Sequence, residues 1–249
     1  MWEYSITFED EKSSEFFKRK LNKIIKEHNG IITGLYSLNC YKILIAVPIA
    51  ERFKIHNIIK EKIAESILLF FKKKFILSRL DFEINKTIEM SVFIKSLIVF
   101  DSDIDKEIII ERLKFDNNLI VNSFLNFKLG FLKNKWKELI SLANDNAMYL
   151  LSRDSFLELI KFLISNLENR QYVVNIFFKK DCYILCDIEG NIIKDFLLEK
   201  NMIYDDISLL KSLIALNPQK IIIHCNSFIK DRLLKNLYEF FSNRIEIKK

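Results

Sequence analysis

The residue best placed for chemistry is His224, which ends a short predicted strand. It follows the apolar run Ile221–Ile223, and α/β folds place ligands at the ends of such strands. An imidazole acts as a general base or a metal ligand only with a suitable partner, and no nucleophile or carboxylate stands at a recognisable spacing from it. Its neighbour Cys225 points to the opposite face of a strand. We therefore expect a structural or peripheral role for His224, and we predict no catalytic, cofactor-binding or metal-ligating residue.

The cysteines offer a second candidate for chemistry, a soft-metal site built from Cys182, Cys186 and Cys225 beside His224. Four residues along one strand separate the first two sulfur atoms by about 13 Å, which is too far for one zinc ion. Buried free cysteine commonly behaves as a small apolar side chain. Because the chain shows no export signal, we expect its cysteines to be reduced thiols.

Three aspartates at alternate positions, Asp101, Asp103 and Asp105, resemble the start of an EF-hand calcium loop. That loop requires glycine at its sixth position and glutamate at its twelfth, but this chain has lysine and arginine there. Carboxylates near the first turn of a helix stabilise it through hydrogen bonds and charge. We therefore interpret the three aspartates as capping acids of a helix beginning near Ile104, and we expect no calcium site.

Two basic stretches lie on predicted helices. We interpret their lysines as solvated, because lysines at successive helical positions point in several directions and do not line one groove. The two stretches are Lys72–Lys74 and the four lysines around Trp136, namely Lys128, Lys133, Lys135 and Lys137.

Composition excludes several classes of protein. The four glycines are too far apart to form a P-loop or a dinucleotide-binding fingerprint. The net charge of +6 is spread along the chain, so nucleic acid is only an alternative partner, for which Tyr36 and Tyr41 would stack bases. No stretch approaches the ~20 apolar residues that span a bilayer, and the N-terminus lacks signal-peptide features. We expect a cytoplasmic protein without a membrane span.

Residues 1–60 predict a βαββ unit. Large apolar and polar residues alternate in its strands, as in half-buried sheets. Ser13 and Ser14 are predicted N-caps of its helix, and Asn29-Gly30 is its predicted end because both residues tolerate a left-handed backbone. The predicted strands are Trp2–Phe8, Ile31–Tyr36 and Tyr41–Val47.

Residues 61–168 predict a helical region. Apolar residues recur there at helical spacing without an interrupting proline, and Gly130 is predicted to lie inside its helix. The predicted helices are about Lys86–Phe100, Ile104–Leu113, Leu119–Asn144 and Ala147–Glu168.

Residues 169–249 predict a small mixed sheet with helices. A β-rich hairpin and a turn at Glu189–Asn191 come first; helices then alternate with strands. The predicted elements are the hairpin strands Tyr172–Phe178 and Cys182–Asp187, the helices Asp205–Leu216 and Phe228–Phe241, and the strands Ile221–Ile223 and Arg244–Ile247. The sequence therefore predicts a mixed α+β fold, with an N-terminal βαββ unit, a central helical region and a C-terminal mixed sheet.

Three stretches of the C-terminal half share a pattern with a known family. Asp205–His224 has an acidic start, a Leu/Ile-rich helix, Pro218 and an Ile-rich strand ending in histidine. Leu125–Gln171 carries a long pair of predicted helices, and Phe228–Ile247 a closing helix and strand. In these features the chain resembles the YtxC sporulation family over about residues 120–249.

This resemblance implies a cytoplasmic protein of spore-forming Gram-positive bacteria and their relatives, with no activity attached to it. Family members can end in a cysteine-rich tail, whereas this chain ends at Lys249, so no metal role of such a tail carries over. In addition, Lys211 stands where the family tends to have a small residue. We expect a non-enzymatic interaction or scaffold protein with protein partners and no cofactor. The alternative is a nucleic-acid-associated protein that binds RNA or DNA.

Overall fold

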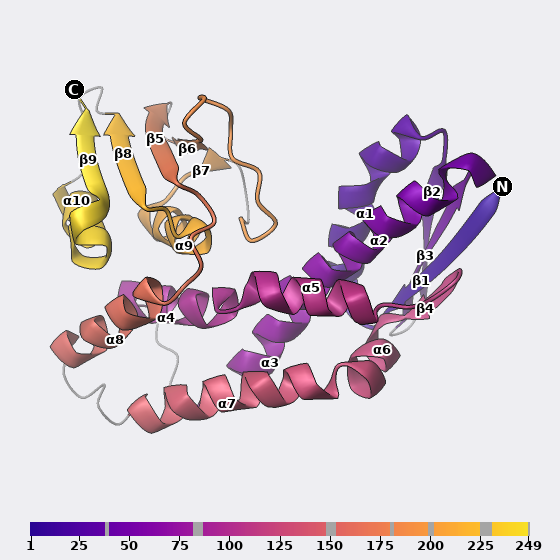
Figure 1. Ribbon diagram of the computed structural model, residues 1–249, viewed down its shortest axis with the longest axis horizontal. Helices are drawn as coiled ribbons and strands as arrows, with labels where there is room; N and C mark the ends of the chain where they lie inside the picture. Colours follow the sequence, from indigo (N-terminus) through magenta and orange to yellow (C-terminus); the bar gives the residue numbers. More distant parts are fainter. Residues whose placement is uncertain are drawn as a thin grey trace. The chain divides into compact units, whose positions relative to one another are not determined.

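The computed structural model describes residues 1–37, 40–81, 87–147, 153–179, 182–198, 202–224 and 231–248. The chain forms two compact units, and each has its own sheet (Figure 1). Unit 1 contains Met1–Arg79 and Ser102–Ile140, and unit 2 contains Leu80–Asp101 and Ser141–Lys249. The predicted mixed α+β class is confirmed. The predicted regions 1–60, 61–168 and 169–249 describe the order of elements along the chain, and as domains they stay a prediction.

Unit 1 is built on a four-stranded sheet of order β2-β3-β1-β4. Its strands are β1 (Trp2–Phe8), β2 (Ile31–Ser37), β3 (Cys40–Val47) and β4 (Asn118–Ile120). β3 pairs antiparallel with β1 and β2, and β4 pairs parallel with β1. Alternate side chains such as Ile6 and Ile43 are fully buried, and Phe8 packs against Phe17 of the first helix, so helices cover one face. The predicted βαββ unit is confirmed.

The first helix, α1 (Glu11–Glu27), differs from the prediction at its start. Its N-cap is Asp10, whose carboxylate accepts a 2.7 Å hydrogen bond from the backbone N–H of Ser13. Ser13 and Ser14 are buried inside the first turn, so predicting them as caps was wrong. At the other end Asn29 has a φ of 54°, which confirms the predicted left-handed exit.

The remaining helices of unit 1 include a long one that starts beside the sheet and runs away from it (Figure 1). A short 3₁₀ turn, η1 (Ile49–Glu51), leads into one continuous rod in which a π-helical stretch separates two α-helical parts. The rod consists of α2 (Arg52–Ser66), the π-helical η2 (Ile67–Lys72) and α3 (Lys73–Leu77). The other helices are α5 (Ser102–Arg112), α6 (Val121–Lys128) and α7 (Gly130–Ala147), of which α7 belongs to this unit up to Ile140.

The single predicted helix Leu119–Asn144 is wrong. Residues Asn118–Ile120 form β4, because they pair with Ser5–Thr7 of β1. The helix that follows, α6, ends at Lys128, and its C-cap Leu129 is fully buried with a non-helical φ of −113°. Gly130 then begins α7 and does not lie inside a helix. Helical periodicity cannot reveal β4, because pairing with a distant strand overrides local propensity.

Unit 2 is built on a five-stranded sheet of order β7-β6-β5-β8-β9. Its strands are β5 (Val173–Lys179), β6 (Cys182–Cys186), β7 (Met202–Ile203), β8 (Lys220–His224) and β9 (Ile245–Lys248). β5 and β6 form the predicted antiparallel hairpin, and β5, β8 and β9 run parallel to one another. The predicted C-terminal sheet is therefore confirmed.

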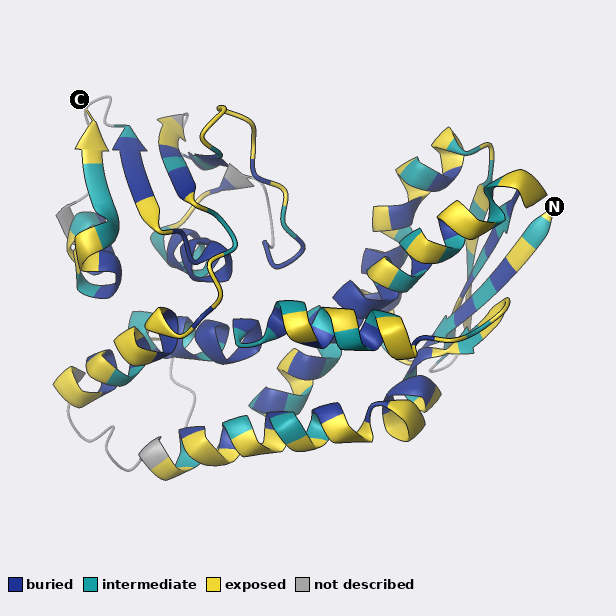
Figure 2. Cartoon of the chain, viewed as in Figure 1, coloured by how far each residue is buried: buried dark blue, intermediate teal, exposed yellow. Residues whose placement is uncertain are grey.

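The helices of unit 2 are α4 (Ile88–Val99), α8 (Arg153–Ser165), α9 (Asp206–Leu216) and α10 (Asp231–Phe241), with a 3₁₀ turn η4 (Ser242–Arg244) before β9. α9 is buried over nearly its whole length (Figure 2). Ala147 ends α7 and does not begin α8, so that predicted start was wrong; the predicted start of the last helix, Phe228, lies outside the described residues. Among the helices described, none combines the length and apolar character needed to cross a bilayer.

Candidate functional site

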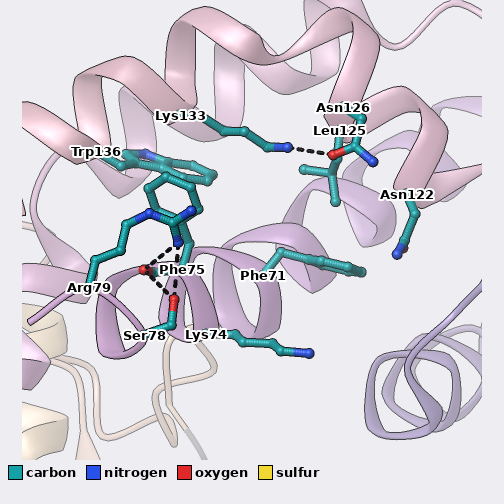
Figure 3. Close-up of a pocket in the computed structure, with 10 residues that line it drawn as sticks. All are labelled: Phe71, Lys74, Phe75, Ser78, Arg79, Asn122, Leu125, Asn126, Lys133 and Trp136. Atoms are coloured by element: carbon teal, nitrogen blue, oxygen red, sulfur yellow. Dashed lines mark hydrogen bonds between the residues drawn. The ribbon is translucent and has the colours of Figure 1, made fainter.

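A pocket of about 220 Å³ lies in unit 1 between the rod of η2 and α3 on one side and helices α6 and α7 on the other (Figure 3). Its base is apolar and aromatic, and its rim is basic and amide-bearing. The lining residues are Phe71, Lys74, Phe75, Ser78, Arg79, Asn122, Leu125, Asn126, Lys133 and Trp136.

Helical geometry explains why these side chains meet. On the rod they stand at offsets of three and four residues, from Phe71 to Arg79, and such residues share one helical face. On α7, Lys133 and Trp136 are three residues apart and face the rod. The sequence shows each of these faces as a helical spacing. It does not show that the two faces lie against each other, because this depends on the break at Leu129 between α6 and α7.

Aromatic contacts form the base of the pocket. The rings of Phe75 and Trp136 are 5.7 Å apart in an edge-to-face arrangement, a favourable geometry for aromatic quadrupoles. The guanidinium of Arg79 lies 3.9 Å above the Phe75 ring. Arg79 also donates a 3.0 Å hydrogen bond to the Ser78 hydroxyl. The arginine is therefore held at the rim with its charge directed along the aromatic surface.

The charge around the pocket is unbalanced. Three basic side chains and no acidic one occur among its described lining residues, the bases being Lys74, Arg79 and Lys133. Lys133 donates a 2.6 Å hydrogen bond to Asn126. Desolvation, followed by the positive charges of Arg79 and Lys137, lowers the pKa of Lys133. A bound anion would offset this repulsion, so the electrostatics favour a negatively charged ligand.

A buried ion-pair network stands behind the pocket. Asp105 Oδ2 accepts hydrogen bonds from Lys72 Nζ at 2.8 Å and from Trp136 Nε1 at 2.9 Å, and Oδ1 accepts one from Lys135 Nζ at 3.0 Å. The side chains of Lys72 and Asp105 are 0% and 1% exposed. The carboxylate thus ties the rod to α7 and fixes the orientation of the indole that lines the pocket.

This network adds to one interpretation from the sequence and corrects another. Asp105 lies in the first turn of α5, as the capping interpretation requires, but tertiary contacts use both of its carboxylate oxygens. Lys72 is not solvated, and Lys135 is bound to the same carboxylate. Helical periodicity alone does not pair residues 33 positions apart.

The π-helical stretch η2 leads directly into the pocket wall. π-helical turns are rare and frequently occur at functional sites, because they shift the following side chains around the helix axis. Here the stretch ends at Lys72, which points inward to Asp105, while its neighbour Phe71 lines the pocket. The π-helical stretch therefore lies where adjacent residues of one helix contribute to both the buried ion-pair network and the pocket.

The other two aspartates lie at the start of α5. That helix begins at Ser102, two residues before the predicted start near Ile104, and Asp103 occupies its first turn as a capping interpretation requires. Asp101 precedes the helix with a φ of 53°. Among the residues described, no three His, Cys, Asp or Glu side chains gather closely enough to hold a metal ion. The expectation of no calcium binding stays a prediction.

His224 lies in unit 2, at the end of β8. Its Nε2 is 2.9 Å from Asn175 Oδ1 on the neighbouring strand β5. Its ring stacks on Phe177 with centroids 4.2 Å apart and planes 11° apart. His224 also borders a cavity of only about 10 Å³. These contacts favour the expected structural role, which stays a prediction.

Within the part of the chain that the structure describes, the cysteines form no disulfide. Cys182 and Cys186 are both buried on β6, whereas Cys225 lies outside the described residues. Burial, followed by the charge of Asp187, raises the pKa of Cys186, so this sulfur stays protonated near neutral pH and is a poor metal ligand.

The tyrosines predicted as a base-stacking platform lie on the face of the sheet that carries the helices. Tyr41 stands opposite Phe8 and Tyr36 stands opposite Tyr41, in register with the fully buried positions. Lys18 of α1 lies 5.7 Å from the Tyr36 ring. The open face of this sheet therefore does not display them.

The fold and the pocket define the class as a two-unit α+β protein with a basic, aromatic-walled pocket in one unit. The model of the YtxC-like family matches residues 50–246. The chain belongs to the YtxC-like family, which confirms the resemblance seen in its C-terminal half and extends it through the central helices that line the pocket. Comparison with curated proteins gave no match, and comparison with solved structures gave none either.

Proposed function

We propose that this member of the YtxC-like family is a non-enzymatic interaction protein of the cytoplasm, and that its unit 1 pocket binds an acidic segment of a protein partner. A role in sporulation rests on the family name. The observation that carries the proposal is the set of lining residues, in which three basic side chains and no acidic one surround an aromatic base.

The size and chemistry of the pocket support this kind of ligand. Cofactors and drug-sized ligands fill pockets of about 300–1,000 Å³, whereas this one encloses about 220 Å³. Such a volume suits one large apolar side chain of a partner. Carboxylates flanking that side chain would meet Lys74, Arg79 and Lys133 at the rim, where charge-assisted hydrogen bonds are the strong ones.

Nucleic acid is the second candidate. The observation in its favour is that cations and aromatic rings lie together at one site, as in proteins that bind single strands. Single-strand sites usually follow the backbone along an extended groove and display their aromatic rings openly. Here Trp136 is only 2% exposed and the pocket is short, so we favour the protein partner.

Tryptophan fluorescence tests the proposal directly, because the chain contains only Trp2 and Trp136. In a Trp2→Phe background, Trp136 reports on the pocket alone. We expect a peptide of ~12 residues with a central Phe between Asp and Glu residues to change the Trp136 emission saturably. We expect a matched peptide with Lys in place of the acids, and a uridine RNA of ~12 nucleotides, to bind more weakly.

A matched pair of variants identifies the site. Lys133→Gln removes a rim charge and should weaken peptide binding about tenfold, the equivalent of ~1.4 kcal/mol for one charge-assisted hydrogen bond. Lys137→Gln removes a charge one turn away that does not line the pocket, and it should change the affinity about twofold at most. If both variants weaken binding equally, the affinity depends on the net charge of the chain and not on the pocket. Tighter binding of the RNA than of the acidic peptide would favour the second candidate.

A further inference from the structure

Among the strands that the structure describes, one edge of the unit 1 sheet is unlike the other three sheet edges. Free edges template pairing with other chains, and proteins usually protect them with short strands, charges or proline. Three edges are protected in this way: β4 has three residues, β7 has two, and β9 carries Glu246 and Lys248. β2 has seven residues, Ile-Ile-Thr-Gly-Leu-Tyr-Ser, without a charge or a proline.

The exposed apolar side chains of β2 are those expected of an edge strand that pairs with another chain. Among the described strands β2 pairs only with β3. Three of its large side chains are more than half exposed, namely Ile31 at 66%, Leu35 at 55% and Tyr36 at 53%. Ile31 and Leu35 lie on the open face of the sheet, because their partners in β3 are Ala46 and Lys42. An apolar strand with both an open edge and an open face is an aggregation hazard unless it is paired.

We infer that β2 is a self-association edge, at which β2 of two copies pairs antiparallel around a two-fold axis and joins the two four-stranded sheets into one. This inference goes beyond the proposed function and uses none of the pocket residues. A second copy is the occupant that the strand itself favours. A two-fold antiparallel pair sets each strand against its own sequence, and this sequence contains no charge to repel its copy.

Placing the two-fold axis at Gly34 gives a register in which the side chains form compatible cross-strand pairs. Ile32 then lies opposite the partner's Tyr36, an aromatic and β-branched pair of the kind that stabilises antiparallel strands. Thr33 lies opposite the partner's Leu35 on the open face. A Cβ at Gly34 would lie 2.5 Å from the Tyr36 hydroxyl oxygen, so the exposed Tyr36 side chain lies over this glycine and would have to move aside for a larger residue.

Salt distinguishes this association from one bridged by nucleic acid. Each chain carries a net charge of +6, so two copies repel each other, and added salt screens that repulsion. Association through β2 should therefore persist or strengthen as salt is raised. Nucleic-acid bridging should weaken steeply over the same range, because salt opposes the release of counterions.

Sedimentation of the full chain tests the inference. We expect a reversible dimer with a dissociation constant on the order of micromolar, since one strand pair forms a small interface. Thr33→Lys places a gatekeeper charge on the edge strand, and it should weaken dimerisation at least tenfold while the circular dichroism spectrum stays unchanged. Ser5→Lys is the matched control, with the same new charge on the same open face but on the central strand β1, and it should leave the dimer intact.

Ile31→Lys serves as the second variant should Thr33→Lys unfold, since Ile31 is exposed at the start of the same strand. Independently of any variant, the outward backbone amides of β2 should exchange hydrogen more slowly at concentrations above the dissociation constant. A chain that stays monomeric at about 100 μM overturns the inference. So does a dimer that withstands both lysines on β2, one that Ser5→Lys abolishes, or one that nuclease dissolves. None of these results bears on peptide binding in the pocket, so the two proposals fail separately.

Discussion

The Asp105 network offers the sharpest test of the structure, and the perturbation is Asp105→Asn. The substitution keeps the size of the side chain and an acceptor oxygen, but it removes the negative charge that faces Lys72 Nζ at 2.8 Å. Because the Lys72 side chain is 0% exposed, its ammonium would then be buried beside a neutral amide. It would gain no water to replace the lost carboxylate.

The expected magnitude follows from that burial. Removing one partner of a buried pair costs about 3–5 kcal/mol, because an uncompensated charge stays inside the protein. Lys72→Met in the same chain removes that charge, so the double variant should be less destabilised than the sum of the two single variants by about 1–3 kcal/mol. Asp103→Asn is the matched control. It changes a first-turn acid of the same helix and should cost less than about 1 kcal/mol, the usual size of a helix-dipole interaction.

Urea unfolding followed by tryptophan fluorescence measures these free energies in unit 1 alone, since both tryptophans lie in that unit. Circular dichroism of the same samples reports on both units. If Asp105→Asn and Asp103→Asn lower the free energy of unfolding equally, both by less than 1 kcal/mol, Asp105 is a capping acid after all. Additive effects of Asp105→Asn and Lys72→Met would likewise contradict a direct buried pair.

Three further predictions concern single residues. His224→Ala should lower the free energy of unfolding by about 1–3 kcal/mol, through loss of the hydrogen bond to Asn175, and leave partner binding intact; full stability combined with lost function would show a functional histidine. Partial burial raises the pKa of Asp205, but hydrogen bonds from the first turn of α9 and a nearby lysine outweigh it and lower the pKa overall. Its contribution, about 0.5–2 kcal/mol by Asp205→Ala, is therefore complete above the unfolded pKa and should fade below about pH 4 in urea titrations. Gly30→Ala should lower the melting temperature, since its Cβ would lie 2.8 Å from a backbone oxygen, whereas Gly130→Ala meets no atom within 4 Å and should be neutral or raise stability by up to about 1 kcal/mol.

Elements that depend on local patterns were predictable from the sequence. Alternation placed β1, β5 and β6, and the left-handed backbone at Asn29 followed from its residue type. The hairpin of unit 2 was predicted because two β-rich runs stand close together. The family resemblance was carried by stretches of the same kind, in which a capped helix runs into an Ile-rich strand.

The candidate site was predictable only in pieces. Lys133 and Trp136 belong to a basic stretch that was singled out, yet its lysines were interpreted as solvated. The pocket lies between the rod and two separate helices, α6 and α7, with the break at Leu129 directly before Gly130. No single window of sequence shows which helices lie against each other.

By itself the sequence determined which stretches were helices and strands wherever a residue's neighbours along the chain decide its conformation. It also determined the mixed α+β class, because the two hydrophobic periods need no distant partner to be recognised. The tertiary structure alone decided which charges are buried. The free energy of burying a lysine such as Lys72 depends on whether a carboxylate from another helix lies within 3 Å of its ammonium group. The spacing of residues along the sequence does not give that distance.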